Sequence, residues 1–116
     1  MKILVGDILA QEGVALLRES ADIAVDVKPK MELRELINCI GEYDALLVRS
    51  ATKVTKEVID AAKNLRVIGR AGVGVDNIDV EAASKKGILV MNTPGGNTIS
   101  AAEHTMSMLL ALSRCI

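Results

Sequence analysis

Residues 45–70 read ALLVRSATKVTKEVIDAAKNLRVIGR, and this stretch decides the fold. The apolar run at residues 45–48 predicts a central β-strand, and residues 66–70 predict another. Between them, Thr55 can cap a helix that ends near Asn64. Sequential strands joined by a helix lie parallel with a right-handed crossover, so the stretch predicts an α/β fold.

The same alternation of strand and helix signals extends over the rest of the chain. Further apolar runs predict strands at residues 2–6, 22–27 and 88–92. The run at residues 22–27 alternates polar and apolar residues, which is typical of an edge strand. The remaining helix signals are the apolar spacings at residues 10–17 and 33–40, and Asp79 as a cap with Gly87 as a terminator. We therefore expect a flavodoxin-like, doubly wound sheet of five parallel strands in the order 2-1-3-4-5, with helices on both faces.

Residues 98–116 predict a long helix with an unusual distribution of apolar side chains. Ser100 and Glu103 have the spacing of a capping box, which would start the helix at Ser100. From residue 105 onwards the segment reads TMSMLLALSRCI, with Arg114 as its one charged residue. A helix that is apolar on every side is normally buried on every side. Either the core is unusually thick, or a further domain or chain covers this helix; we favour the second interpretation and expect the bare helix to drive self-association or to be displaced.

The composition argues against several classes of function. With 14 Lys and Arg against 15 Asp and Glu, the chain has no basic excess for nucleic acid, and Tyr43 alone cannot form a base-stacking platform. No apolar stretch approaches the roughly 20 residues that span a bilayer, and no signal peptide is expected. Cys39 and Cys115 are expected to be reduced thiols of a cytoplasmic protein, not a disulfide or metal pair. His104 is expected on a helix surface or at a domain interface.

The residues that follow the strands carry the candidate chemistry, because ligands of open parallel sheets bind beyond the carboxyl ends of the strands. Arg49 and Arg70 follow neighbouring central strands, and each offers a donor fork suited to a carboxylate or phosphate. Gly72 and Gly74 can expose backbone N–H groups in the next loop. The last helix begins near Asn97, and its N-terminus also favours an anion. Together these groups predict a site for a small anion.

Two other sites that fit this fold are disfavoured. The run at residues 72–74 is not a dinucleotide fingerprint, because Asn77 occupies the place of the third glycine and the run follows a fourth strand. A phosphoacceptor receiver domain would need clustered acids after the first strand, an Asp after the third and a Lys after the fifth. The chain has Asp7, Arg49 and Asn92 at those places.

Three stretches resemble one enzyme family. They are LVRSATKVTKEVIDAA at residues 47–62, VIGRAGVGVDNID at residues 67–79 and KGILVMNTPGGNTISAAE at residues 86–103. Together they resemble the NAD-dependent D-isomer-specific 2-hydroxyacid dehydrogenases, and the RSAT and GRAG segments are most similar to the D-3-phosphoglycerate dehydrogenase branch. The resemblance covers essentially the whole chain.

This resemblance implies a two-domain enzyme with a discontinuous substrate-binding domain. Residues 1–97 would form the N-terminal part of that domain. Residues 98–116 would be a linker helix leading to a nucleotide-binding domain outside this chain, which would account for the apolar character of the helix.

Position by position, the resemblance also implies roles for individual residues. The residues that would bind the substrate or line its cleft are Arg49, Ser50, Arg70, Gly72, Gly74 and Asn97. Val73 stands where some relatives have a threonine near the nicotinamide of NAD, so a side-chain hydrogen bond made there is absent here.

The nucleotide fingerprint and the catalytic Arg, Glu and His of the family have no match in residues 1–116, so we expect no catalysis by this chain alone. The intact protein would be a cytoplasmic homo-oligomer that uses NAD to oxidise 3-phosphoglycerate, a small anionic metabolite, to 3-phosphohydroxypyruvate on the route to serine. Two alternatives stay open. One is another D-2-hydroxyacid dehydrogenase, and the other is an interaction module like the corepressors of this superfamily, which the scarcity of aromatic residues disfavours.

Overall fold

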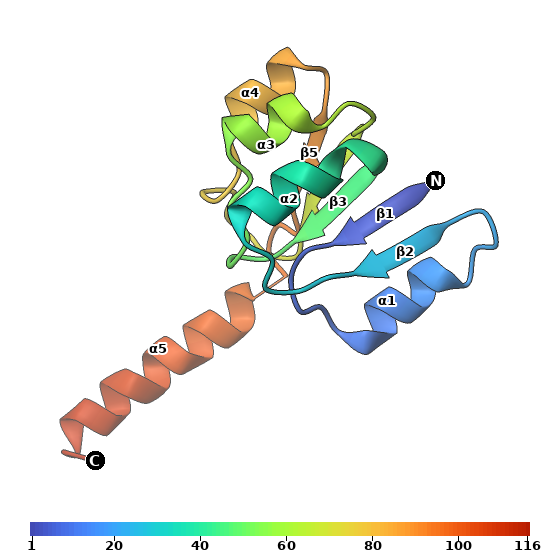
Figure 1. Ribbon diagram of the computed structural model, residues 1–116. Helices are drawn as coiled ribbons and strands as arrows, with labels where there is room; N and C mark the ends of the chain where they lie inside the picture. The colour runs from blue at the N-terminus through green and yellow to red at the C-terminus, as the bar shows by residue number, and fades with distance from the viewer.

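A computed structural model describes residues 1–116 and contains one five-stranded parallel sheet (Figure 1). Its strands lie in the order β2-β1-β3-β4-β5, as the sequence predicted. Their bounds are β1 Lys2–Val5, β2 Ala24–Val27, β3 Ala45–Val48, β4 Val67–Arg70 and β5 Leu89–Met91. Each central strand is a short aliphatic run, which is the usual composition of strands covered on both faces.

Helices follow the strands throughout. Their bounds are α1 Gln11–Arg18, α2 Leu33–Cys39, the short 3-10 helix η1 Ile40–Glu42, α3 Lys56–Ala61, α4 Val80–Lys85 and α5 Thr98–Ser113. The predicted start of α4 is confirmed, because the Asp79 carboxylate accepts a hydrogen bond from the backbone N–H of Ala82 at 2.9 Å. Its predicted terminator is also confirmed, since Gly87 has a φ of 75°, which glycine adopts without strain.

Helix α3 ends earlier than the sequence predicted. The expected end was near Asn64, whereas the last helical residue is Ala61. The ammonium of Lys86 donates to three carbonyl oxygens at this end, those of Ile59, Asp60 and Ala62, at 2.6, 3.0 and 2.9 Å. A cation that satisfies the free carbonyls also interacts favourably with the helix dipole. This contact comes from a residue 24 positions beyond Ala62, so local helix signals could not show it.

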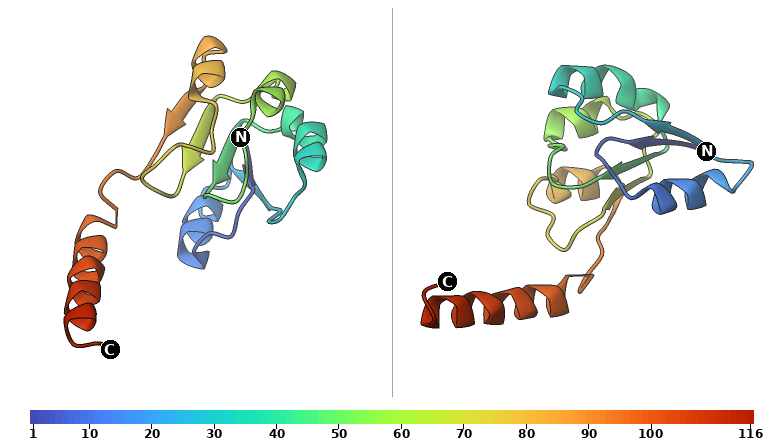
Figure 2. Two further views of the ribbon diagram at one scale, coloured as in Figure 1. Left: turned by 90° about the vertical axis from the view of Figure 1, so that its left-hand side faces the viewer. Right: turned by 90° about the horizontal axis from the view of Figure 1, so that it is seen from below.

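The two faces of the sheet are covered unequally. On one face α2, α3 and α4 pack over alternate strand residues, including Leu4, Leu46 and Ile68, and form the main core (Figures 1 and 2). On the other face lies α1, which contributes no buried residue. The expectation of helices on both faces is therefore met, although one face has little cover.

The thinly covered face carries an apolar cavity of about 390 Å³. Its lining includes Ile3, Leu47 and Val67 from the strands and Leu17 from α1. Gly69 also lies here, and a Cβ at this position would be 2.7 Å from the Cδ2 atom of Leu47, so a larger residue would require the Leu47 side chain to move. We refer to this surface as the open sheet face.

Helix α5 projects away from the sheet, and the whole molecule including this helix is 55 Å long (Figures 1 and 2). None of its residues is buried, and Leu109 and Leu112 are 59% and 72% exposed. The predicted capping box is wrong. The helix begins at Thr98, and the Ser100 hydroxyl donates to the carbonyl of Asn97 instead of accepting a backbone N–H. None of the helices combines the length and the apolar character that are needed to span a bilayer.

The exposure of α5 predicts that the 116-residue chain self-associates. We expect sedimentation velocity to show association that increases with concentration, because a row of bare leucine and methionine side chains is costly in water. Substitution of Leu109 and Leu112 by Glu should shift the chain towards monomer. Ser107→Glu combined with Ser113→Glu adds the same charge to this helix without removing apolar area and is the control. A monomer at every concentration would contradict this prediction.

Tyr43 provides a test of the packing of the main core. Burial of its ring and the hydrogen bond that its hydroxyl donates to Asp26, 2.7 Å away, raise the pKa of the phenol. A raised pKa in the folded state stabilises the protein below the unfolded pKa of about 10, and this stability is lost as the pH rises further. The phenolate absorbance of this single aromatic residue should therefore appear only above the usual range and together with loss of the circular dichroism signal. A titration near pH 10 with the fold intact would argue against the packing described here.

Candidate anion-binding site

The carboxyl ends of β1, β3 and β4 meet at one edge of the sheet and bring three loops together. The register pairs Val48 with Arg70 and Val5 with Leu47, so the three strands end at neighbouring positions. The loop at residues 49–52 lies between the loop that follows β1 and the glycine-containing loop that follows β4. This is the edge at which ligands of open parallel sheets bind.

A cavity of about 300 Å³ lies at this edge. Its lining consists of Asp7, Ile8, Lys30, Arg49, Ser50 and Ala51. The Arg49 guanidinium donates to the carbonyl of Ile8 at 3.4 Å, which leaves most of its five N–H groups free. With Lys30 in the same cavity, two positive charges and the Ser50 hydroxyl are available to an anion.

Arg70 does not share this cavity. The sequence predicted that Arg49 and Arg70 face one site, whereas Arg70 lines the cavity on the open sheet face. Its side chain is 11% exposed and is held by its own loop: it donates to the carbonyl of Gly74 and lies 3.5 Å from the carboxylate of Asp76. Its Nε also donates to the carbonyl of Arg49 at 3.4 Å. The Arg70 side chain therefore contacts the backbone of Arg49, while the two guanidinium groups belong to different cavities.

Gly74 gives the Arg70 side chain room in this loop, whereas a Cβ at Gly72 would make only an ordinary van der Waals contact with it. A Cβ at Gly74 would lie 3.0 Å from Nη1 of Arg70, and one at Gly72 would lie 3.5 Å from its guanidinium carbon. The backbone groups of Gly72 are used inside the molecule, since its N–H donates to Arg70 at 2.9 Å and its carbonyl accepts from Thr93 at 2.9 Å. The loop therefore packs around Arg70 and does not present its N–H groups freely, as the sequence had suggested.

The other residues singled out in the sequence do not line the cavity of Arg49. Val73 is 46% exposed, and its carbonyl accepts a hydrogen bond from the side chain of Asn92 at 2.7 Å. Asn97 is exposed and precedes α5 without a side-chain capping bond. His104 lies exposed within α5.

Sequence reasoning missed three residues of this region. Lys30 follows a proline and has a φ of 64°, an uncommon conformation for lysine, and its short loop carried no site signal. Asp7 and Asn77 are the two buried polar residues of the chain, each 5% exposed. Two features of the sequence could have indicated these polar residues. Asp7 stands at a strand end, and Asn77 stands where a dinucleotide fingerprint has its third glycine.

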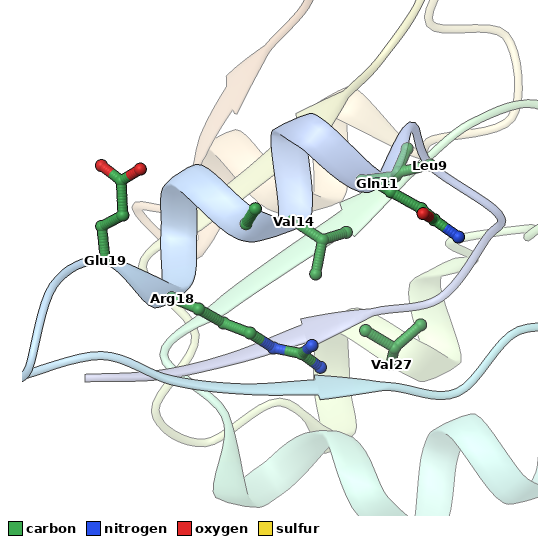
Figure 3. A pocket seen from close by; sticks show the side chains of 7 residues that line it. Leu9, Gln11, Val14, Arg18, Glu19 and Val27 are labelled. Carbon is green, nitrogen blue, oxygen red and sulfur yellow. The ribbon is translucent and has the colours of Figure 1, made fainter.

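A larger groove lies elsewhere, between α1 and β2 (Figure 3). It has a volume of about 610 Å³. Val14 and Arg18 project into it from α1, and Val27 projects into it from the edge strand (Figure 3). The groove contains none of the residues that follow β3, β4 or β5, and its lining has one arginine and one glutamate, Arg18 and Glu19. The smaller cavity at Arg49 is therefore the better candidate for an anion.

Comparisons with known proteins identify the chain's relatives. The family model described as D-isomer specific 2-hydroxyacid dehydrogenase, catalytic domain, matches residues 3–115. The chain is 53% identical over 116 residues to D-3-phosphoglycerate dehydrogenase of Archaeoglobus fulgidus, covering 100% of this chain and 22% of that protein. It is also 53% identical over 115 residues to D-3-phosphoglycerate dehydrogenase of Synechocystis, covering 99% and 20%. The chain thus spans about a fifth of the length of these curated relatives.

Among solved structures, the chain is similar to NAD⁺-bound 3-phosphoglycerate dehydrogenase of Entamoeba histolytica. The TM-score is 0.82 at 36% identity, and the match covers 96% of this chain and 38% of that one. The sheet and its helices are therefore those of a dehydrogenase domain.

The cavity predicts that the 116-residue chain binds inorganic phosphate at Arg49. In a titration followed by amide NMR shifts, the largest changes should occur at Lys30, Arg49 and Ser50. Arg49→Gln should weaken binding about tenfold, because a charged hydrogen bond contributes roughly 1.5–3 kcal/mol. The matched control is Arg66→Gln, because Arg66 is exposed and precedes β4 at the end of the strand that lies away from the site. Equal weakening by both variants, or shifts centred on the groove of Figure 3, would contradict this assignment.

Proposed function

Because the chain belongs to the D-isomer-specific 2-hydroxyacid dehydrogenases, we propose that it is the substrate-binding portion of an NAD-dependent phosphoglycerate dehydrogenase. The proposed reaction is the oxidation of 3-phosphoglycerate to 3-phosphohydroxypyruvate, on the route to serine. The observation that carries the proposal is the cavity at the carboxyl ends of β1 and β3, where Arg49 and Lys30 place two positive charges beside the Ser50 hydroxyl.

The charge of the cavity suits a substrate that carries both a phosphate and a carboxylate. Arg49, Ser50 and Lys30 hold one of these groups, with the arginine fork matching two anionic oxygens. Arg70 lines a different cavity, so to bind the other group its guanidinium would have to leave Gly74 and Asp76 and turn towards the cavity of Arg49. Its guanidinium lies 3.5 Å from the carboxylate of Asp76, whose side chain is 83% exposed, so a substrate carboxylate can replace this contact. Held in this way, the substrate has a fixed orientation, which is the part of the catalytic effect that this chain supplies.

The loop after Arg70 supports the rest of the site. Gly74 allows the loop to close around the guanidinium of Arg70, because a Cβ there would lie 3.0 Å from Nη1, and Gly72 lies beside the same group. We assign Asn97 to the same cleft, because it is exposed directly before α5 and its side-chain amide makes no capping bond there. These residues therefore form the second wall of the proposed cleft.

NAD accepts hydride from the substrate when it is bound, and the residues of this chain fit only a small part of it. Val73 is half exposed and can contact the nicotinamide through its methyl groups. The pyrophosphate of a dinucleotide needs free N–H groups at a glycine turn that opens a helix. Here Gly72 uses its N–H and carbonyl within the chain, and Asn77 follows in the same loop. A nucleotide-binding domain outside residues 1–116 therefore holds most of the cofactor.

The domain organisation follows from the same proposal. Residues 1–97 form part of the substrate-binding domain, and residues 98–116 form the helix that leads to the nucleotide-binding domain. The exposure of α5 supports this division, since its apolar side chains lie bare and require cover. The intact enzyme is a homo-oligomer. It acts in the cytoplasm, in keeping with the free thiols of Cys39 and Cys115.

A chimera tests the proposed activity. Residues 1–116 replace the matching segment of the Archaeoglobus fulgidus relative, to which they align over their full length. We expect the chimera to reduce NAD with 3-phosphoglycerate and to prefer it to lactate, glycerate and formate. In the same protein, Arg49→Gln should raise the KM for 3-phosphoglycerate about tenfold or more and leave the KM for NAD unchanged. The 116-residue chain alone should show no turnover.

Other outcomes decide between the alternatives. Preference for an acid without phosphate would identify another D-2-hydroxyacid dehydrogenase. A folded chimera that turns over none of these acids would remove the enzymatic proposal, whereas specific capture of a protein partner by the chain would favour the interaction module. Turnover by the isolated chain would refute the division of labour between the two domains.

A further inference from the structure

The two buried polar side chains of this protein both hold the loop at residues 49–52. Asp7 lies at the end of β1 and Asn77 in the loop after β4, so they approach this loop from its two neighbours in the sheet. Burying a carboxylate and an amide is costly unless their hydrogen bonds are made. The side chains of Asp7 and Asn77 both make their hydrogen bonds to Arg49 and Thr52, the first and last residues of the loop.

Asp7 accepts three hydrogen bonds from the loop. Its Oδ2 accepts from the backbone N–H of Arg49 at 2.6 Å and from that of Thr52 at 3.2 Å. Its Oδ1 accepts from the hydroxyl of Thr52 at 2.6 Å. Hydrogen bonds to an ionised acceptor are roughly twice as strong as neutral ones. The carboxylate therefore draws both ends of the loop to one point.

Asn77 holds the carbonyl groups of the same two residues. Its Nδ2 donates to the carbonyl of Arg49 at 2.6 Å and to that of Thr52 at 2.7 Å. Its Oδ1 is buried without a hydrogen-bond partner, so all the hydrogen bonds of this side chain serve the loop. An apolar residue of the same size would remove both of these hydrogen bonds and leave the Arg49 carbonyl with the 3.4 Å contact from Nε of Arg70 alone.

Together these contacts fix the direction of the Arg49 side chain. Its N–H is held by Asp7 and its carbonyl by Asn77, so the peptide groups on both sides of its Cα are held. The Cα–Cβ bond then points in one direction, towards the cavity that Arg49 shares with Lys30 and Ser50. A flexible loop would have to give up this freedom whenever an anion bound.

We propose that Asp7 and Asn77 are positioning residues that preorganise the Arg49 loop for the phosphate or carboxylate of the substrate. This inference rests on the proposed function. Asp7 itself lines the cavity, and its negative charge opposes an anion there. Asp7 therefore favours anion binding by holding the Arg49 loop in place, and this gain in binding free energy exceeds the electrostatic repulsion.

Asp7→Asn distinguishes the positioning role of Asp7 from its negative charge, because losing each of them changes the affinity for phosphate in the opposite direction. Removing the negative charge alone would strengthen the binding of inorganic phosphate. Losing one of the acceptors for the Arg49 and Thr52 donors frees the loop, and we expect a net weakening of about tenfold. The measurement is the Kd of the 116-residue chain for phosphate, together with its Tm. Asp44→Asn is the matched control, because this carboxylate also accepts a backbone N–H, that of Lys2 at 2.7 Å, at the opposite ends of the strands.

A second set of variants keeps the charge constant. Asn77→Leu should weaken phosphate binding, whereas Asn64→Leu, at an exposed amide that donates to Gly41, should not. Thr52→Val removes one hydrogen bond to Asp7 and keeps the volume, so it should also weaken binding. Thr52→Ser keeps the hydroxyl and should restore it. If Asp7→Asn does not fold, the Thr52 pair decides the question.

The outcomes distinguish the inference from the function on which it rests. Failure of the unsubstituted chain to bind phosphate or 3-phosphoglycerate would overturn both. Binding by the unsubstituted chain that becomes tighter or stays the same in Asp7→Asn, with Thr52→Val also unchanged, would overturn the positioning role and leave the anion site intact. A fall in Tm without a change in Kd would show that the two residues serve stability alone.

Discussion

The hydrogen bonds between Asp7, Asn77 and the loop at residues 49–52 are the constraint on which the candidate site depends. Parallel pairing of β1, β3 and β4 brings three loops to one edge of the sheet, but pairing alone does not decide where their side chains point. The buried carboxylate and amide make this choice for the central loop. As a result Arg49 and Ser50 lie beside Lys30 in one cavity, and a short segment without regular structure acquires a defined shape.

The open sheet face and α5 share one feature, which is apolar surface that the rest of this chain leaves uncovered. Three helices build the main core on one face, whereas α1 buries none of its residues on the other. A sheet face lined by Ile3, Leu47 and Val67 and a helix with bare leucines both present apolar surface to water. In a protein about five times as long, as the curated relatives are, both surfaces have further chain available to cover them. The fold described here is therefore consistent with a substrate-binding portion that works beside another domain.

The sequence predicted the sheet well because the signals for its strands are local. Short aliphatic runs separated by helix signals were enough to predict five parallel strands and their order, and Asp79 and Gly87 bounded α4 correctly. Some errors came from distant contacts and others from local ones. The carbonyls at the early end of α3 accept from Lys86, which lies 27 residues beyond Ile59, whereas the Ser100 hydroxyl binds the Asn97 carbonyl of its own turn, so the capping box does not form. The site was predicted only in part: Arg70 follows β4 as expected, but its own loop captures its guanidinium, and Lys30 joins the cavity from a loop without a motif.

The central claim is that the cavity beside Arg49 receives the anionic end of a phosphorylated hydroxy acid. A crystal structure of the chain with 3-phosphoglycerate tests this claim most directly. The account predicts that one anionic group of the ligand lies within hydrogen-bond distance of Arg49 and Ser50, and that the Asp7 and Asn77 contacts to the loop are unchanged. Ligand density in the groove between α1 and β2, or on the open sheet face with the Arg49 cavity empty, would contradict the account.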